Sequence, residues 1–260
     1  MTCYRIATAG LGRLFIVGAS TAFAHLTYPV ARDFGSFSLD PRISPINGQT
    51  TKAFGWADGT DADFGHQDDQ RYFKFTLETA TFITISITSQ DPANFLPAFS
   101  IFSGVGHGVA DTSNPDYDGA QITRDYLESL RLADGITREG AFDALHTWKI
   151  ANDPATSFAD LATLVYVGHM ADGTSDNFGL ASGIIGDGVA DGFVTATFEL
   201  PAGVYTLVVG GANYYTADAT SRAFNAIVTN IPEPSCAILL AAGLLPIGLL
   251  RRRSSTSASA

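Results

Sequence analysis

Aspartates and glycines recur together in three stretches of the chain, and this combination suits the binding of a cation. Residues 57–65 read ADGTDADFG, residues 171–179 read ADGTSDNFG, and residues 186–192 read GDGVADG. Calcium takes about six to eight oxygen ligands from a loop that curls around it. The sequence therefore predicts a calcium cofactor, and the candidate ligands are Asp58, Asp61, Asp63, Asp68, Asp69, Asp172, Asp176, Asp187 and Asp191.

A second interpretation of the same stretches needs no metal. Aspartate side chains in turns accept hydrogen bonds from backbone N–H groups of their own loop, and glycine adopts the positive φ angles that tight turns require. None of the three stretches has the spacing of an EF-hand loop. Calcium binding and turn chemistry therefore both remain open at the level of the sequence.

Aromatic and acidic residues raise the question of carbohydrate chemistry. Aromatic rings near strand ends can bind sugars, and the candidates are Trp56, Trp148, Tyr214 and Tyr215. Glycosidases need two carboxyl groups that flank one bond, and these are available from Asp68, Asp69, Glu78 and Glu199. A surface-associated polysaccharide hydrolase or a glycan-binding module is thus the alternative function.

Motifs of hydrolytic chemistry are missing from the sequence. There is no Gly-x-Ser-x-Gly nucleophile motif and no His-Glu-x-x-His metal motif. The paired acids Asp68 and Asp69 fall in a hydrophilic stretch, where the pKa of a carboxyl group is not expected to rise far enough for acid catalysis. We therefore expect a protein that is not an enzyme and has no catalytic residue.

Charge and cysteine content narrow the classes of partner. The whole chain has a net charge of −11, and its middle is more acidic still, because five of the arginines lie near the two ends. Such a surface repels phosphate backbones, which excludes nucleic acid as a partner. The two cysteines, Cys3 and Cys236, lie in the terminal segments, so the middle of the chain has no disulfide.

Alternating apolar and polar residues predict that strands hold these loops in place. The alternation is clear at residues 71–77, 82–88 and 193–200, whereas residues 161–168 and 203–211 are apolar on both faces and are expected to form central strands. We expect residues 25–230 to form one mostly β domain, an antiparallel β-sandwich or jelly roll, with a short helical insertion at residues 123–135.

Two connections in this domain have local signals. Residues 201–203, Pro-Ala-Gly, predict a hairpin turn that joins residues 193–200 to the strand that follows. Pro41 and Pro45 argue against regular structure between them.

Both ends of the chain have the character of export and anchoring signals. The N-terminal apolar stretch ends in a small-x-small pattern at Ala22 and Ala24, which predicts a signal peptide at residues 1–24. Near the other end, Pro232, Glu233 and Pro234 precede the uncharged residues 235–250, which predict a transmembrane helix that ends at a basic cluster. The cluster is Arg251, Arg252 and Arg253, and a short polar tail follows at residues 254–260.

The order of these C-terminal features, at residues 231–253, resembles the PEP-CTERM sorting signal. The resemblance implies an exosortase substrate that is exported to the envelope or extracellular surface of a Gram-negative bacterium that makes exopolysaccharide. The stretch DGTDADFGHQDDQRYFKFTL and the strands after it resemble bacterial prepeptidase C-terminal-type sandwiches, and residues 166–215 resemble other PEP-CTERM ectodomains. We therefore expect a structural or adhesive protein of the envelope or the exopolysaccharide matrix.

Overall fold

The computed structural model describes residues 28–53, 55–56, 64–66, 70–106, 141–150, 162–179, 183–213 and 220–231. Within these ranges the chain is mostly β-strand, and the helical elements are two 3-10 turns, Val30–Arg32 and Ser175–Asn177. The strands are β1 Asp33–Phe37, β2 Arg42–Lys52, β3 Phe64–His66, β4 Arg71–Leu77, β5 Thr81–Ser89, β6 Pro97–Ser103, β7 Ala141–Asp143, β8 Trp148–Ile150, β9 Ala162–Ala171, β10 Phe193–Leu200, β11 Gly203–Gly211 and β12 Ser221–Ile231.

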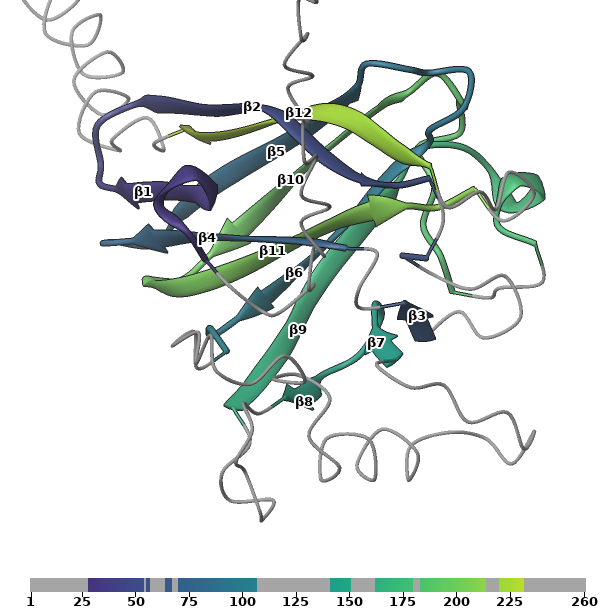
Figure 1. Ribbon diagram of the computed structural model, residues 1–260. Helices are drawn as coiled ribbons and strands as arrows, with labels where there is room; N and C mark the ends of the chain where they lie inside the picture. Colours follow the sequence, from purple (N-terminus) through teal and green to yellow (C-terminus); the bar gives the residue numbers. More distant parts are fainter. Residues whose placement is uncertain are drawn as a thin grey trace, which may run out of the picture.

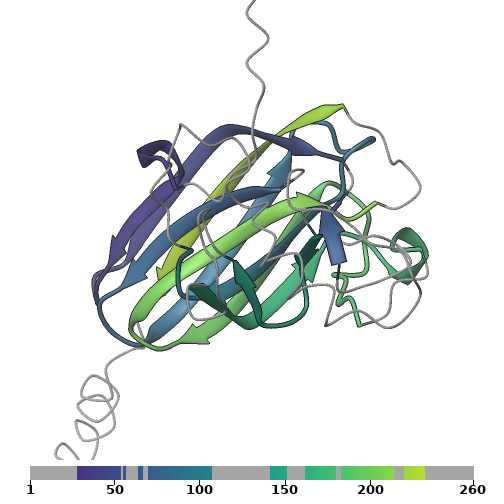
Figure 2. The ribbon, with the colours of Figure 1, turned by 60° about the horizontal axis from the view of Figure 1, so that its bottom comes forward.

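Two sheets form the body of the domain (Figure 1). The larger sheet has six strands in the order β1-β4-β11-β6-β9-β8, and the smaller has four in the order β10-β5-β12-β2. The short strands β3 and β7 pair separately. All strand pairs are antiparallel except β1 with β4. Figure 2 shows the sheets as stacked layers, which confirms the predicted mostly β sandwich.

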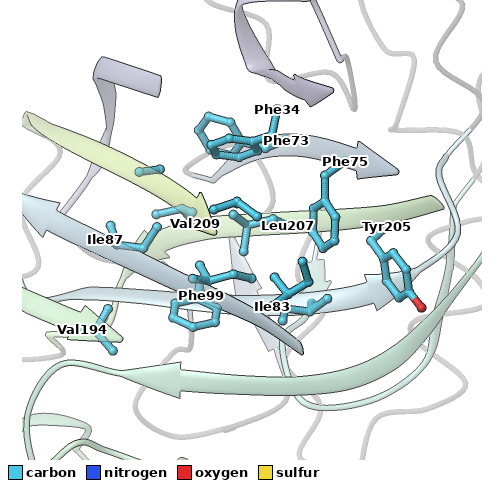
Figure 3. Close-up of a cluster of buried hydrophobic side chains, with 14 of the residues drawn as sticks. Phe34, Phe73, Phe75, Ile83, Ile87, Phe99, Val194, Tyr205, Leu207 and Val209 are labelled. Carbon is cyan, nitrogen blue, oxygen red and sulfur yellow. The ribbon is translucent and has the colours of Figure 1, made fainter. Parts of the chain in front are cut away.

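The alternation predicted from the sequence builds the core between the sheets. Ile83, Ile85 and Ile87 of β5 are fully buried, whereas Thr84 and Ser86 between them are only partly covered. Figure 3 shows that side chains from both sheets meet in this layer. Its buried rings include those of Phe34, Phe37, Phe73, Phe75, Phe95 and Phe99.

A second apolar cluster lies on the opposite face of the larger sheet. It includes Trp56, Tyr72, Phe102 and Val208, all buried. Leu207 and Val209, on either side of Val208, belong instead to the core between the sheets. Neighbouring residues in a strand point to opposite faces, so β11 is apolar on both faces because it separates two buried clusters.

The predicted hairpin at residues 201–203 is wrong. Strand β10 pairs with β5 in the smaller sheet, and β11 pairs with β4 and β6 in the larger one. The chain therefore crosses from one sheet to the other at Pro201 and Ala202. The Tyr205 hydroxyl supports this crossing, because it donates a hydrogen bond to the Pro201 carbonyl over 2.8 Å.

Two further expectations, for the segments that form β2 and β9, differ from the structure because of where these strands lie in their sheets. Residues 42–52 form the long strand β2, although it contains Pro45. A proline is tolerated there because β2 is an edge strand, which pairs on one side only. Strand β9 was expected to be central, but Val165 and Val167 are 48% and 37% exposed, because β9 is the last long strand of its sheet.

Several predicted segments lie outside the described residues. They are the signal peptide at 1–24, the helix at 123–135, and the sorting signal at 231–253 apart from residue 231 at the end of β12. Among the residues that the structure does describe, no helix is long and apolar enough to cross a membrane.

Candidate functional site

Asp172 lies at the centre of the described acidic loops, immediately after the last residue of β9. Its side chain is fully buried. One carboxylate oxygen accepts the backbone N–H of Asp191 over 3.0 Å, and the other accepts that of Gly192 over 2.7 Å. The backbone N–H of Asp172 donates to the Pro97 carbonyl. Asp172 thus joins the end of β9 to the start of β10.

Asp187 and Asp191 also bind backbone amides. Oδ1 of Asp187 accepts the N–H of Gly173 over 3.0 Å and that of Val189 over 3.2 Å. Oδ1 of Asp191 accepts the N–H of Phe193, two residues further along, over 3.0 Å. These contacts are those of Asx turns, together with one bond between loops.

Hydrogen bonds between backbone groups also join the segment at residues 171–173 to the segment at residues 187–188. The N–H of Asp187 donates to the Ala171 carbonyl, and the N–H of Gly188 donates to the Gly173 carbonyl, each over 3.0 Å. Gly173 has φ +117, and a Cβ atom there would lie 2.7 Å from Oδ1 of Asn177. The glycine is therefore required both by its backbone conformation and by the close approach of Asn177.

Burial sets the protonation behaviour of Asp172. Removal from water raises the pKa of this carboxyl group from 3.8 to about 6. The two N–H donors lower this pKa, and the nearby carboxylates of Asp187 and Asp191 raise it. Burial is the largest of these effects, so the negative charge is retained at neutral pH only at a cost in free energy.

A polar network lies beside this loop in the second apolar cluster, around His169 of β9. Nε2 of His169 accepts the N–H of Ile185 over 2.8 Å, and Nδ1 lies 2.5 Å from the Tyr166 hydroxyl. Because Nε2 is an acceptor, the proton of the neutral ring is on Nδ1, which donates to Tyr166. The His169 ring also lies 5.6 Å from the Trp56 ring, centroid to centroid.

The imidazole of His169 is held neutral. It is 5% exposed, and burial lowers the pKa of the ring from 6.5 to about 4. A metal ion on this histidine would have to displace a hydrogen bond at either ring nitrogen. The geometry therefore fits a structural histidine. No sequence motif singles this histidine out, and its only signal is its position in an apolar strand.

Trp56 belongs to the same network. Its indole N–H donates to the Ser100 hydroxyl over 3.0 Å, and that hydroxyl donates to the Ala144 carbonyl over 2.7 Å. Both Trp56 and Ser100 are fully buried. The indole thus presents no exposed face to a sugar, and its role in the described structure is packing. Trp148, the other candidate tryptophan, begins β8, where it pairs with Leu164.

Three other candidate residues that the structure describes have exposed side chains. Asp176 is exposed in the 3-10 turn Ser175–Asn177. Glu78 and Glu199 are exposed, Glu78 just after β4 and Glu199 near the end of β10. The other candidates lie outside the described residues: Ala22, Ala24, Asp58, Asp61, Asp63, Asp68, Asp69, Tyr214, Tyr215, Pro232, Glu233, Pro234, Arg251, Arg252 and Arg253.

Comparison with known proteins finds similarity only at the level of structure. No family model matches the chain, and no curated protein matches its sequence. CorA, a surface-associated copper-binding protein of Methylomicrobium album BG8, is 18% identical with a TM-score of 0.48, over 75% of this chain and 98% of CorA. MopE, a secreted copper-binding protein of Methylococcus capsulatus, is 16% identical with a TM-score of 0.42, over 77% of this chain and 87% of MopE.

The hydrogen bonds of the described aspartates correct the expected calcium cofactor. Both Asp172 oxygens and one oxygen each of Asp187 and Asp191 accept backbone N–H groups. In the part of the chain that the structure describes, no group of three or more His, Cys, Asp or Glu side chains is arranged to hold a metal ion. In the described loops, turn chemistry explains the aspartates.

Proposed function

We propose that this chain is an exported, non-catalytic protein of the bacterial surface, with a structural or adhesive role in the envelope or the exopolysaccharide matrix. Exosortase handles the protein through residues 231–253, and the β domain is displayed outside the cell. The Pro-Glu-Pro motif, the apolar span and the arginine cluster support the sorting step.

One structural observation supports the non-catalytic role. Among the described residues, the buried polar side chains that are chemically most suited to catalysis, Asp172 and His169, accept hydrogen bonds from backbone N–H groups of neighbouring loops. A general acid or base must instead reach the proton of a substrate. The geometry of these two residues thus serves the framework of the sandwich.

The alternative of a polysaccharide hydrolase leads to a direct experiment. The purified chain is incubated with envelope polysaccharides, and new reducing ends are measured. The proposal expects no turnover. Turnover that is lost in Asp68→Asn, Asp69→Asn or Glu78→Gln variants with unchanged melting temperatures would establish the hydrolase and overturn the non-catalytic role.

The sorting step has its own test. Deleting residues 232–253 should remove the protein from the envelope fraction of the producing cell, because the recognition motif and the anchor are lost together. An unchanged distribution between the envelope and the medium would reject exosortase as the partner.

A further inference from the structure

Among the described residues, no strand pairs with the outer edge of β10, and this edge lacks the features that protect the opposite edge of the same sheet. Strand β10 is the outermost strand of the smaller sheet, and all eight of its residues pair with β5 in an unbroken register. Its only charged residue is Glu199, next to its last position. The opposite edge, β2, contains Pro45 and Lys52 and a bulge, where two of its residues, 47 and 48, lie opposite Asn225 of β12. Proline, lysine and bulges are the usual means of preventing edge-to-edge pairing.

The inner face of β10 is only half covered. Ala196 and Phe198 point toward the core but remain partly exposed, whereas the residues beside them on β5, Ile85 and Ile83, are fully buried. On β9, Val165 is 48% exposed. This side of the sandwich therefore leaves apolar surface in water, and covering it is favourable.

The sequence of β10 is complementary to itself. In an antiparallel pair of two copies centred on Ala196, Val194 of one copy lies opposite Phe198 of the other. Thr195 likewise lies opposite Thr197. Side chains alternate with a period of two, so this register keeps inward residues opposite inward ones. Aromatic residues opposite β-branched ones, and threonine opposite threonine, are favourable cross-strand pairs.

Charge also permits this contact between two acidic molecules. Residues 193–198 are uncharged, and the register places Glu199 opposite Phe193 rather than opposite another acid. Like charges directly opposite would destabilise the pair. In a chain of net charge −11, a neutral edge of this length is suited to contact with a second copy.

In the part of the chain that the structure describes, no strand of the larger sheet pairs with this edge. Strand β8 extends that sheet furthest, but it pairs only with residues 162–164 of β9. Strand β10 meets β9 elsewhere, at Gly168, where a Cβ atom would lie 2.6 Å from the Phe198 ring. On the outer face, Thr195 and Thr197 are exposed.

We propose that β10 pairs antiparallel with β10 of a second copy of this chain, centred on Ala196, so that the two smaller sheets form one continuous sheet. The partner is thus the protein itself. The inference rests on the described strands and is independent of sorting by exosortase, so each can fail without the other.

Cysteine cross-linking tests the pairing and its register. Ala196→Cys is introduced into the full-length chain, purified in detergent and oxidised. Opposite residues of an antiparallel pair have Cα atoms about 4.5–5.5 Å apart, so a covalent dimer should form. Two controls should give only background dimer: the parent chain, with Cys3 and Cys236, and Thr50→Cys, at an exposed position of the opposite edge strand.

The same experiment can overturn the proposal. Dimer yields from Ala196→Cys no higher than those from Thr50→Cys would reject the pairing, and so would a maximum yield from Thr195→Cys or Thr197→Cys alone. A mixture of Thr195→Cys and Thr197→Cys chains should instead give the mixed dimer. Cross-links from position 196 only to a different protein would also reject it.

A charged variant provides a second measurement. Thr197→Lys places two lysines close to the dimer axis on exposed positions, so the mass measured by light scattering should fall from dimer to monomer. Thr50→Lys adds the same charge at the other edge and should leave the dimer intact. Circular dichroism confirms that both variants are folded. A Thr197→Lys variant that stays dimeric, or a parent chain that is monomeric at all concentrations tested, contradicts the proposal.

Discussion

The two buried titratable groups, His169 and Asp172, should drive the pH dependence of stability in opposite directions. The pKa of His169 falls from 6.5 to about 4 in the folded chain. The unfolded chain therefore binds more protons between these pH values. The stability contributed by the neutral ring is complete above pH 6.5 and is lost as the pH falls toward 4. Each pH unit corresponds to about 1.4 kcal/mol, so the total loss is about 3 kcal/mol.

The contribution of Asp172 to the pH dependence of stability has the opposite sign. Its pKa rises from 3.8 to about 6 on folding, so the folded chain binds more protons between these values. Its contribution to stability is greatest below pH 3.8 and is lost as the pH rises through 6, again by about 3 kcal/mol. In the parent chain the two effects nearly cancel between pH 6 and 4.

Single variants should expose each effect. Urea unfolding is measured at pH 7 and pH 4.5 for the parent, His169→Gln, Asp172→Asn and the double variant. Relative to the parent, acidification should favour folding of His169→Gln by about 2–3 kcal/mol and disfavour folding of Asp172→Asn by about 2 kcal/mol. The double variant should return close to the parent profile. Parallel pH profiles in all four proteins would refute the assignment of these shifts to burial.

Two other predictions concern the loop around Asp172. Gly173→Ala should lower the free energy of unfolding by about 2–3 kcal/mol, because it combines an unfavourable positive φ with a clash against Asn177. Gly188→Ala, where φ is +93 and no atom lies within 4 Å of the added Cβ, should cost only about 1 kcal/mol, and equal losses in urea unfolding would contradict the role of the clash. Asp172→Ala should destabilise the chain by about 1–3 kcal/mol through its lost backbone bonds. This loss should be the same with calcium as with a chelator, whereas a loss seen only with calcium would restore the metal as a ligand of this loop.

The strands could be predicted because their pattern is local. In β4, β5 and β10 the alternation of side chains follows directly from the pleat of a strand with one buried face. Pairing is not local. Pro201 and Ala202 have the composition of a hairpin turn, yet each flanking strand pairs with partners distant in the sequence. Sequence composition cannot reveal that choice, because it depends on how both sheets close over one core.

The same distinction between local pattern and non-local contact applies to the candidate site. The Asp and Gly content of residues 171–192 correctly indicates tight loops that need carboxylates. Whether those carboxylates bind an ion or N–H groups depends on distances between Asp172 and residues 191 and 192, which the sequence does not contain. His169 gave even less signal, since its partners Tyr166 and Ile185 become neighbours only through the fold.

The location of the protein in its own cell tests the central proposal most directly. Two deletions are compared by fractionation and immunodetection: residues 232–253, which removes the proposed sorting motif and anchor, and residues 254–260, which removes only the polar tail. The first should shift the protein out of the envelope fraction, and the second should leave it there with the full-length chain. Identical distributions of both variants and the parent would contradict the proposed surface sorting.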